Sequence, residues 1–164
     1  MKRGQIQLSF GMIFSIIIVI ATLAVAGYFI VQFLNQKNTF ECNQLYQILQ
    51  EEVNKAWNEG DYGSNSKIVK LSAPSGIKEI CIGNRSSVIS EKKYTSEYEF
   101  MKKYASTDNN LILYPGDSCG SRKDFAKTIL HIETGKFFCI ESDSGKIELK
   151  LSIDSSSPLV KISK

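Results

Sequence analysis

A long uncharged segment close to the start of the chain constrains its fold most strongly. The 33 residues from Gly4 to Gln36 contain no acid and no base, and Leu8 to Leu34 is almost wholly apolar. A bilayer core about 30 Å thick is crossed by ~20 helical residues, so the segment is long enough to span a membrane. The apolar region of a secretory signal peptide is shorter, at roughly 7–15 residues. We therefore expect a retained transmembrane helix.

The charges on either side of this segment predict its orientation. Lys2 and Arg3 precede it, whereas only Lys37 follows it directly. By the positive-inside rule, the N-terminus lies in the cytoplasm and residues 38–164 lie outside the cell membrane. Those residues hold all 17 acids and 17 of the 20 bases, so they are neutral and the formal charge of +3 comes from the flanks of the segment. The basic balance thus reflects membrane topology, and we expect no nucleic-acid partner.

Four cysteines follow the apolar segment: Cys42, Cys81, Cys119 and Cys139. In an oxidising exterior this even number predicts two disulfides. Their spacings of 39, 38 and 20 residues contain no close pair of the kind that structural zinc sites use, so we expect no metal. Of the three possible pairings we expect Cys42–Cys81, which ties the helix to the early strands, and Cys119–Cys139.

Apolar residues recur at three- and four-residue steps after the membrane segment, which predicts an amphipathic helix over residues 37–60. Its apolar stripe consists of Phe40, Cys42, Leu45, Tyr46, Leu49, Val53, Ala56 and Trp57. No proline or glycine lies between Tyr28 and Glu59, so this helix can continue the membrane helix. The polar patch Asn35–Thr39 equally suits a break, with a new helix capped there. We expect Trp57 to be buried at the far end of the stripe.

Beyond residue 60 short apolar segments alternate with turn-forming residues, which is typical of an antiparallel β-sheet. The predicted strands are 67–72 and 77–83, joined as a hairpin, then 111–115, 127–134, 135–142, 145–154 and an edge strand at 159–162. The clearest is 145–154, where apolar residues alternate strictly with polar ones: Ile147, Leu149, Leu151 and Ile153. A short helix is expected around Tyr94, Tyr98 and Met101. The stripe of the amphipathic helix should cover the sheet.

No group of residues indicates an active site, and we expect a protein that is not an enzyme and needs no cofactor. Gly116-Asp117-Ser118 is similar to part of the nucleophile segment of trypsin-like proteases, but a serine nucleophile needs a neighbouring base. The one histidine, His131, lies thirteen residues later in a predicted strand. Acidic residues stand at alternate positions early in residues 141–148, but the segment lacks the full pattern of a calcium-binding loop. Asn84 begins a glycosylation sequon, Asn-Arg-Ser.

The stretch Lys2-Arg3-Gly4-Gln5, followed by the apolar helix, resembles the class III leader of archaeal type IV pilins and archaellins. The resemblance implies that a prepilin peptidase cleaves between Gly4 and Gln5. It also implies that the helix is retained, as a membrane anchor in the precursor and as the surface through which like subunits pack in a filament. The chain is similar, too, to small membrane-anchored archaeal proteins that begin KRGQ, from which no activity follows.

One residue departs from this family pattern. Many such subunits carry a glutamate where Ser9 stands here, and a serine cannot pair with the amino terminus of a neighbouring subunit. Two hypotheses therefore stay open. The chain is either a type IV pilin-like filament subunit, of the major or the minor kind, or an uncleaved, membrane-anchored surface domain that binds an unknown ligand.

The predicted fold class is α+β, with a long N-terminal helix, transmembrane and then amphipathic, packed on a disulfide-bonded antiparallel β-sheet. Four parts are expected along the chain: a cytoplasmic leader at 1–4, a transmembrane helix at 5–36, an amphipathic helix at 37–60 and an extracytoplasmic β-rich domain at 61–164.

Overall fold

The fold is α+β, as expected. The computed structural model describes four stretches of the chain, residues 10–59, 66–120, 124–154 and 157–164. The chain divides into two compact units, Met1–Gln36 and Lys37–Lys164, each of which is described by itself.

Helix α1 runs from Phe10 to Glu59. It continues through the polar patch at 35–39, so the continuous helix is the correct alternative. No proline or glycine in that region removes a helical hydrogen bond or loosens the backbone. In the first unit, every described side chain from Gly11 to Leu34 is exposed. This part of α1 is long and apolar enough to cross a membrane.

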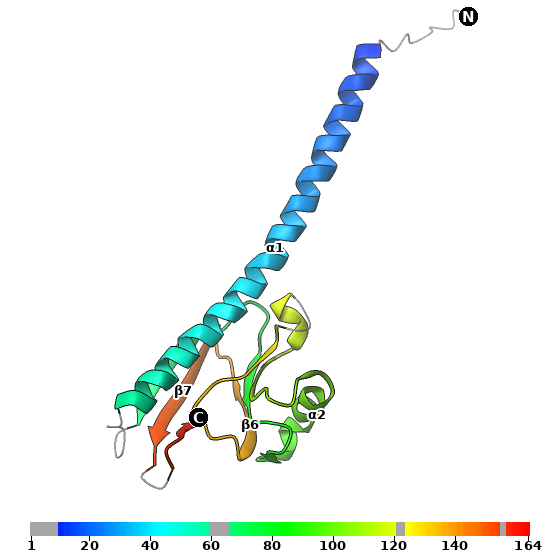
Figure 1. The fold of residues 1–164 in the computed structure, drawn as a ribbon. Helices are drawn as coiled ribbons and strands as arrows, with labels where there is room; N and C mark the ends of the chain where they lie inside the picture. The colour runs from blue at the N-terminus through cyan, green and yellow to red at the C-terminus, as the bar shows by residue number, and fades with distance from the viewer. Residues whose placement is uncertain (1–9, 60–65, 121–123, 155–156) are drawn as a thin grey trace, which may run out of the picture. The chain divides into compact units, whose positions relative to one another are not determined.

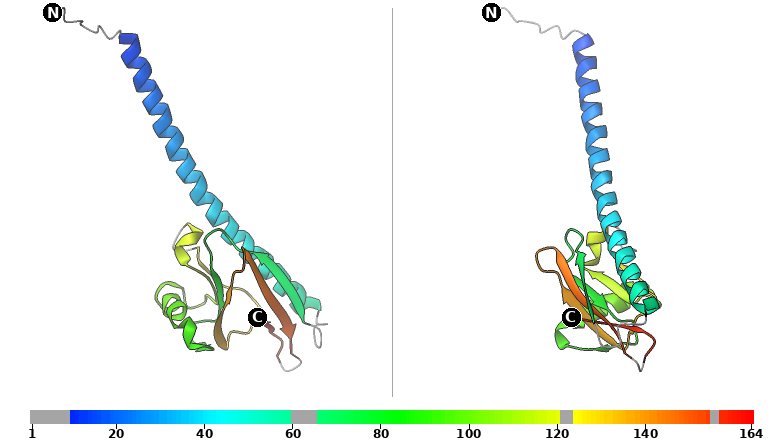
Figure 2. Two further views of the ribbon diagram at one scale, coloured as in Figure 1. Left: turned by 180° about the vertical axis from the view of Figure 1, so that it is seen from behind. Right: turned by 90° about the vertical axis from the view of Figure 1, so that its left-hand side faces the viewer.

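The second unit contains two β-sheets where the sequence predicted one. The first sheet has the strand order β1–β7–β8 and is antiparallel throughout, with β1 at Lys67–Ser72, β7 at Lys146–Ile153 and β8 at Val160–Ser163. Strand β8 (red) runs beside β7 (orange) in Figure 2. The predicted strands at 67–72 and 145–154 and the predicted edge strand at the C-terminal end are therefore confirmed.

The second sheet has the order β3–β6–β2–β4–β5. Its strands are β2 (Glu79–Ile82), β3 (Val88–Ile89), β4 (Leu111–Tyr114), β5 (Ala126–Lys127) and β6 (Lys136–Glu141). The pairs are antiparallel except for β3 with β6, which is parallel. Three short helices complete the described part of the unit: η1 at Lys92–Tyr94, α2 at Thr95–Tyr104 and η2 at Gly116–Cys119.

The apolar stripe of α1, except Phe40 and Trp57, which are exposed, packs into the larger core of this unit. Leu49, Val53 and Ala56 are fully buried and belong to one cluster with Leu149 and Leu151 of β7. Alternation explains the contribution of β7, because residues two apart point to the same face of a strand. Its apolar side chains face α1 while its lysines face solvent.

A smaller core lies on the opposite face of the second sheet. Tyr98 and Met101 of α2 pack there with Phe137, Cys81 and Cys139. Ile80 and Ile82, which flank Cys81 in β2, belong instead to the larger core. The second sheet is thus covered by α1 on one face and by α2 on the other, on either side of β6 (Figure 1).

All four cysteines form disulfides, but the predicted pairing is wrong. The bonds are Cys42–Cys119 and Cys81–Cys139. Cys81 lies directly opposite Cys139 in the register of β2 with β6, so these two thiols meet across neighbouring strands. The short helix η2 carries Cys119 to α1, where Thr39 donates a hydrogen bond to the Cys119 carbonyl at 2.9 Å. The spacing of the cysteines in the sequence does not reveal which strands pair or in which register.

The predicted hairpin of strands 67–72 and 77–83 is also wrong. Strand β1 pairs with β7, whereas β2 pairs with β4 and β6 in the other sheet. The side chains of β2 are buried on both faces, so this strand needs a neighbour on each side and a layer above and below. A two-stranded hairpin with β1 would have left it half covered.

The environment of Trp57 differs from the prediction as well. Trp57 is 42% exposed, and Ala56 fills the core at the end of the stripe instead. The indole stacks on the ring of His131, with centroids 3.8 Å apart and planes 8° apart. His131 lies in a turn with φ of 64°, so the strand predicted at 127–134 is wrong beyond Lys127.

Candidate functional site

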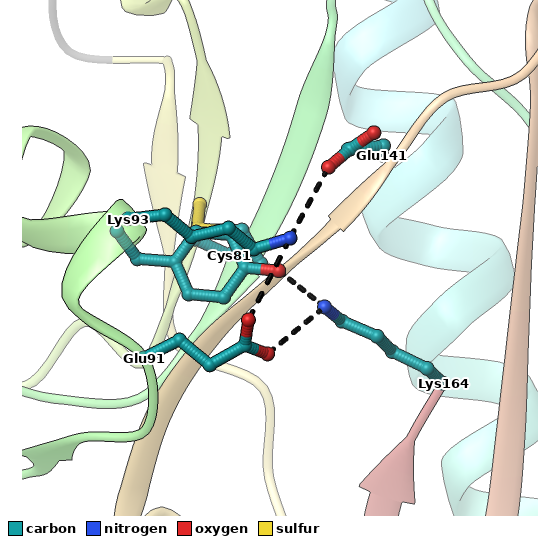
Figure 3. A network of polar contacts seen from close by, with 7 residues as sticks. Cys81, Glu91, Lys93, Glu141 and Lys164 are labelled. Atoms are coloured by element: carbon teal, nitrogen blue, oxygen red, sulfur yellow. Dashed lines mark hydrogen bonds and ion pairs between the residues drawn. A yellow bond between two sulfur atoms is a disulfide. The ribbon is translucent and has the colours of Figure 1, made fainter.

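A cluster of charged side chains surrounds the buried Tyr94, at the point where η1 meets the end of β8. Tyr94 is 2% exposed, and its hydroxyl accepts a hydrogen bond from the Lys164 ammonium. Lys164 also lies 3.5 Å from one carboxylate oxygen of Glu91, and Lys93 lies 3.7 Å from the other. A further ion pair of 3.5 Å joins Lys93 to Glu141 of β6 (Figure 3).

The Tyr94 ring adds a second kind of contact to this cluster. The Nζ atoms of Lys93 and Lys164 lie 4.7 and 4.8 Å from its centroid, within the range of cation–π attraction. The contact with the Tyr94 side chain, followed by the charges of Glu91 and Glu141, raises the pKa of Lys93. Two ammonium groups and two carboxylates neutralise one another here. Through these ion pairs, the cluster connects the C-terminal end of the first sheet to the segment around η1 and to β6 of the second sheet.

Glu79 lies near this cluster, on the face of the second sheet that α2 covers. Burial, followed by the negative charges of Glu97 and Glu141, raises the pKa of the Glu79 carboxyl. One oxygen of Glu79 and one of Glu97 are buried and have no hydrogen-bond partner among the described residues. Glu79, Cys81 and Cys139 bring three ligand-type atoms within 4.8 Å of one another. They do not form a metal site, because the two sulfurs are bonded to each other and provide no thiolate.

A groove of about 380 Å³ opens beside the cluster, between β8 and the segment that leads into β6. Phe138 and Ile162 contribute apolar surface, and Lys136, Lys161 and Glu133 contribute charge. The backbone of Val160 bonds to His131 and Glu133 on the side of β8 that faces away from β7. Since antiparallel residues alternate, the peptide groups of Ile162 point the same way, into the groove. The groove can therefore hold a small ligand or a short peptide.

The structure does not bring the protease-like residues together. The Ser118 hydroxyl donates a hydrogen bond to the Gly76 carbonyl at 3.2 Å, and His131 is stacked on Trp57. The neighbouring Cys119 is held in its disulfide. Ser118 and His131 therefore do not form a nucleophile–base pair with each other.

The acids of residues 141–148 also face different partners. Glu141 pairs with Lys93, and Glu148 of β7 pairs with Lys70 of β1 at 2.7 Å. The backbone of Asp143 bonds to that of Lys146 in a tight turn. The carboxylates are thus spread over two sheets and do not converge as calcium ligands would.

The remaining predicted site residues are the sequon and the leader. The Asn84 side chain donates to the Thr134 hydroxyl at 3.1 Å and accepts from the Ser86 amide at 2.9 Å, so its amide nitrogen already has a partner. Gly4 and Gln5 lie outside the described residues, as does Ser9. The leader prediction therefore stays a prediction.

Sequence reasoning did not find the cluster around Tyr94. Lys164 lies 70 residues from Tyr94 in sequence, and Glu141 lies 48 residues from Lys93. No periodicity links such residues, because the pairing depends on which strands lie side by side.

Two carboxylates of this unit should respond to pH in opposite ways. Since the pKa of Glu79 is raised above its ordinary 4.5, its stabilising, protonated form is lost as the pH rises through the folded-state value. Hydrogen bonds from Lys55 and Lys67 lower the pKa of Glu52, whose contribution is present above pH 4.5 and lost as the pH falls. At pH 7 we expect Glu79→Gln to stabilise the unit and Glu52→Gln to destabilise it, each by on the order of 1 kcal/mol.

Urea unfolding of both variants at pH 7 and pH 4, followed by circular dichroism, checks this prediction. Both differences from the wild type should shrink at pH 4. Destabilisation by Glu79→Gln at pH 7 would contradict the statement that the ionised Glu79 carboxylate is unfavourable in the folded unit.

No protein family model, curated protein sequence or solved structure matches the chain.

Proposed function

We propose that the chain is a single-pass membrane protein without enzymatic activity, whose residues 38–164 lie outside the cell. One observation carries this proposal: the uncharged first part of α1 is exposed at every position from Gly11 to Leu34. Sixteen large hydrophobic side chains between Met12 and Leu34 lie open. Burying one such side chain is worth roughly 1.5–3 kcal/mol, so this surface is far more stable in lipid or against like helices than in water.

The second unit supports the proposed side of the membrane. Its four cysteines are all paired in two disulfides, a state that persists in oxidising surroundings and is rare in the cytosol. The bases Lys2 and Arg3 before the apolar segment favour the cytoplasm for the N-terminus. Both arguments give the same orientation.

The proposed role is that of a type IV pilin-like filament subunit. The class III leader pattern at Gly4 and Gln5 supports this role, as does the sharing of α1 between the apolar segment and the core of the second unit. In such a subunit, like helices replace lipid around the apolar segment after the leader has been removed. The membrane is then its first partner and its own copies are the second.

An uncleaved surface domain that binds a ligand is the second candidate. The groove beside Tyr94 favours this candidate, because a domain that binds a small ligand presents a recess with apolar and polar or charged walls. Ser9 favours it too, since this residue cannot supply the carboxylate that many filament subunits carry.

Protease added to intact cells tests the proposed topology. We expect digestion of residues 38–164 while a cytoplasmic marker protein stays intact, with the disulfides reduced before the fragments are separated. Complete protection of the chain until the cells are lysed would contradict an extracytoplasmic domain, whichever of the two roles holds.

A further inference from the structure

A second recess, separate from the groove beside Tyr94, lies between α2, β4 and η2. It has a volume of about 270 Å³. Four aromatic rings and one carboxylate contribute to its walls: Phe100, Tyr104, Tyr114, Phe125 and Asp117. All the described residues that line this recess belong to the second unit.

The aromatic rings are arranged around Phe100. Its centroid lies 5.0 Å from those of Tyr104 and Phe125 and 5.5 Å from that of Tyr114. The planes are inclined to Phe100 by 52°, 59° and 79°, so the four rings form walls of different orientation. Tilted and edge-to-face packing of this kind fixes the rings against one another.

Gly116 is required beneath these rings. A Cβ atom at this position would lie 2.7 Å from Phe100 and 3.0 Å from Phe125, closer than carbon atoms approach. Any larger residue would push the rings outward and change the recess. The sequence at the start of η2 is therefore matched to the aromatic walls.

Among the described residues that line the recess, the charge is of only one sign. Asp117 is exposed and forms no ion pair with any described residue. The lining residues within the described ranges include no lysine and no arginine. The faces of aromatic rings carry the negative part of their quadrupole, which attracts cations. Tyr104 already takes part in such a contact, because the Lys103 Nζ lies 5.1 Å from its centroid. Lys103 itself does not line the recess.

We propose that this recess binds a compact organic ammonium ion. Rings supply apolar contact and cation–π attraction, and Asp117 supplies the counter-charge. An inorganic cation is a poor match, because Ca²⁺ and Mg²⁺ require six or more oxygen ligands and this recess presents few. An alkylammonium group is weakly hydrated and presents carbon to the rings, so it loses little by leaving water.

Choline and its neutral carbon isostere 3,3-dimethylbutan-1-ol test the role of charge directly. Each is titrated into the full chain in maltoside micelles, with binding followed by ligand-observed NMR. We expect choline to bind at least about tenfold more tightly than the isostere, the ratio that ~1.4 kcal/mol of cation–π and ionic attraction gives. Equal affinities would overturn the proposal, and so would the failure of choline to bind.

Matched variants locate the site. Asp117→Asn should weaken choline binding several-fold and leave the isostere unaffected, whereas Asp108→Asn, which removes an exposed carboxylate outside the recess, should change neither. Lys103→Ala removes a competing cation from Tyr104, so choline should bind as tightly as before or more tightly. Weaker choline binding by Lys103→Ala than by the wild type would overturn the assignment, and so would unchanged choline binding by Asp117→Asn. Circular dichroism confirms that each variant is folded.

Two sources of ammonium remain, a lipid headgroup and a free solute. The full chain is placed in nanodiscs with either choline or glycerol headgroups, and the affinity for soluble choline is measured again. Loss of soluble choline binding in choline discs alone assigns the recess to the lipid headgroup. Equal affinity in both discs assigns it to a free ammonium compound.

Discussion

Replacing Leu49 with alanine is expected to lower the free energy of unfolding of residues 37–164 by about 2–5 kcal/mol. Leu49 is fully buried in the middle of the apolar stripe of α1, in the cluster that also holds Leu149 and Leu151. The substitution removes apolar contacts with both the helix and the sheet and leaves a cavity. Because small domains are stable by only about 5–15 kcal/mol, this is a large share of the total.

The neighbouring Ile48 provides the control. It is 40% exposed and so lies off the stripe, and Ile48→Ala should cost less than about 1 kcal/mol. Urea unfolding of the full chain in micelles, followed by the circular dichroism of the β-sheets, measures both variants. Equal losses from the two substitutions would mean that α1 does not cover the sheets as described.

Removing the Cys42–Cys119 disulfide has the second large expected effect. The bond joins residues 77 apart, and a loop of this length corresponds to about 4 kcal/mol in the chain-entropy description of the unfolded state. We expect the double variant Cys42→Ser, Cys119→Ser to lose about that amount. The bond Cys81–Cys139 joins residues 58 apart, so its removal should cost nearly as much.

Peptide mapping without reduction decides the pairing before the variants are compared. It should yield one linked peptide containing Cys42 with Cys119 and another containing Cys81 with Cys139. A peptide that links Cys42 to Cys81 would contradict the arrangement of η2 against α1. If the mapping agrees, chemical unfolding of the two double variants gives the size of each contribution.

Elements with a clear hydrophobic period could be predicted from the sequence. The apolar residues of helix α1 and strand β7 recur with periods of about four and two residues. The C-terminal end of α1 and both ends of β7 lie within two residues of the predicted bounds. The short helix around Tyr98 was found for the same reason. Local pattern is sufficient where one element buries one face.

Partners between elements could not be predicted in this way. Strand β2 carries Ile80, Cys81 and Ile82 with burial on both faces, and nothing in this run says which strands flank it. Both the false hairpin and the false disulfide pairing follow from that one gap, since the register of β2 with β6 places Cys81 opposite Cys139.

Two smaller errors have a steric origin. Trp57 was assigned to the core because it lies four residues after Val53, but Ala56, three residues after Val53, fills that position and leaves the indole on the flank. His131 lies in a pattern that suited a strand, yet its positive φ ends any strand there and turns the imidazole onto Trp57.

Mass spectrometry of the mature N-terminus tests the central proposal most directly, because it separates a processed filament subunit from a permanently anchored surface protein. Purified from its membrane fraction, the chain should begin at Gln5, and a variant with Gly4→Leu should keep Met1 because the cleavage motif is lost. A wild-type chain that begins at Met1 would contradict the pilin-like role while leaving the membrane anchor in place, and a chain that begins beyond residue 25 would contradict the anchor itself.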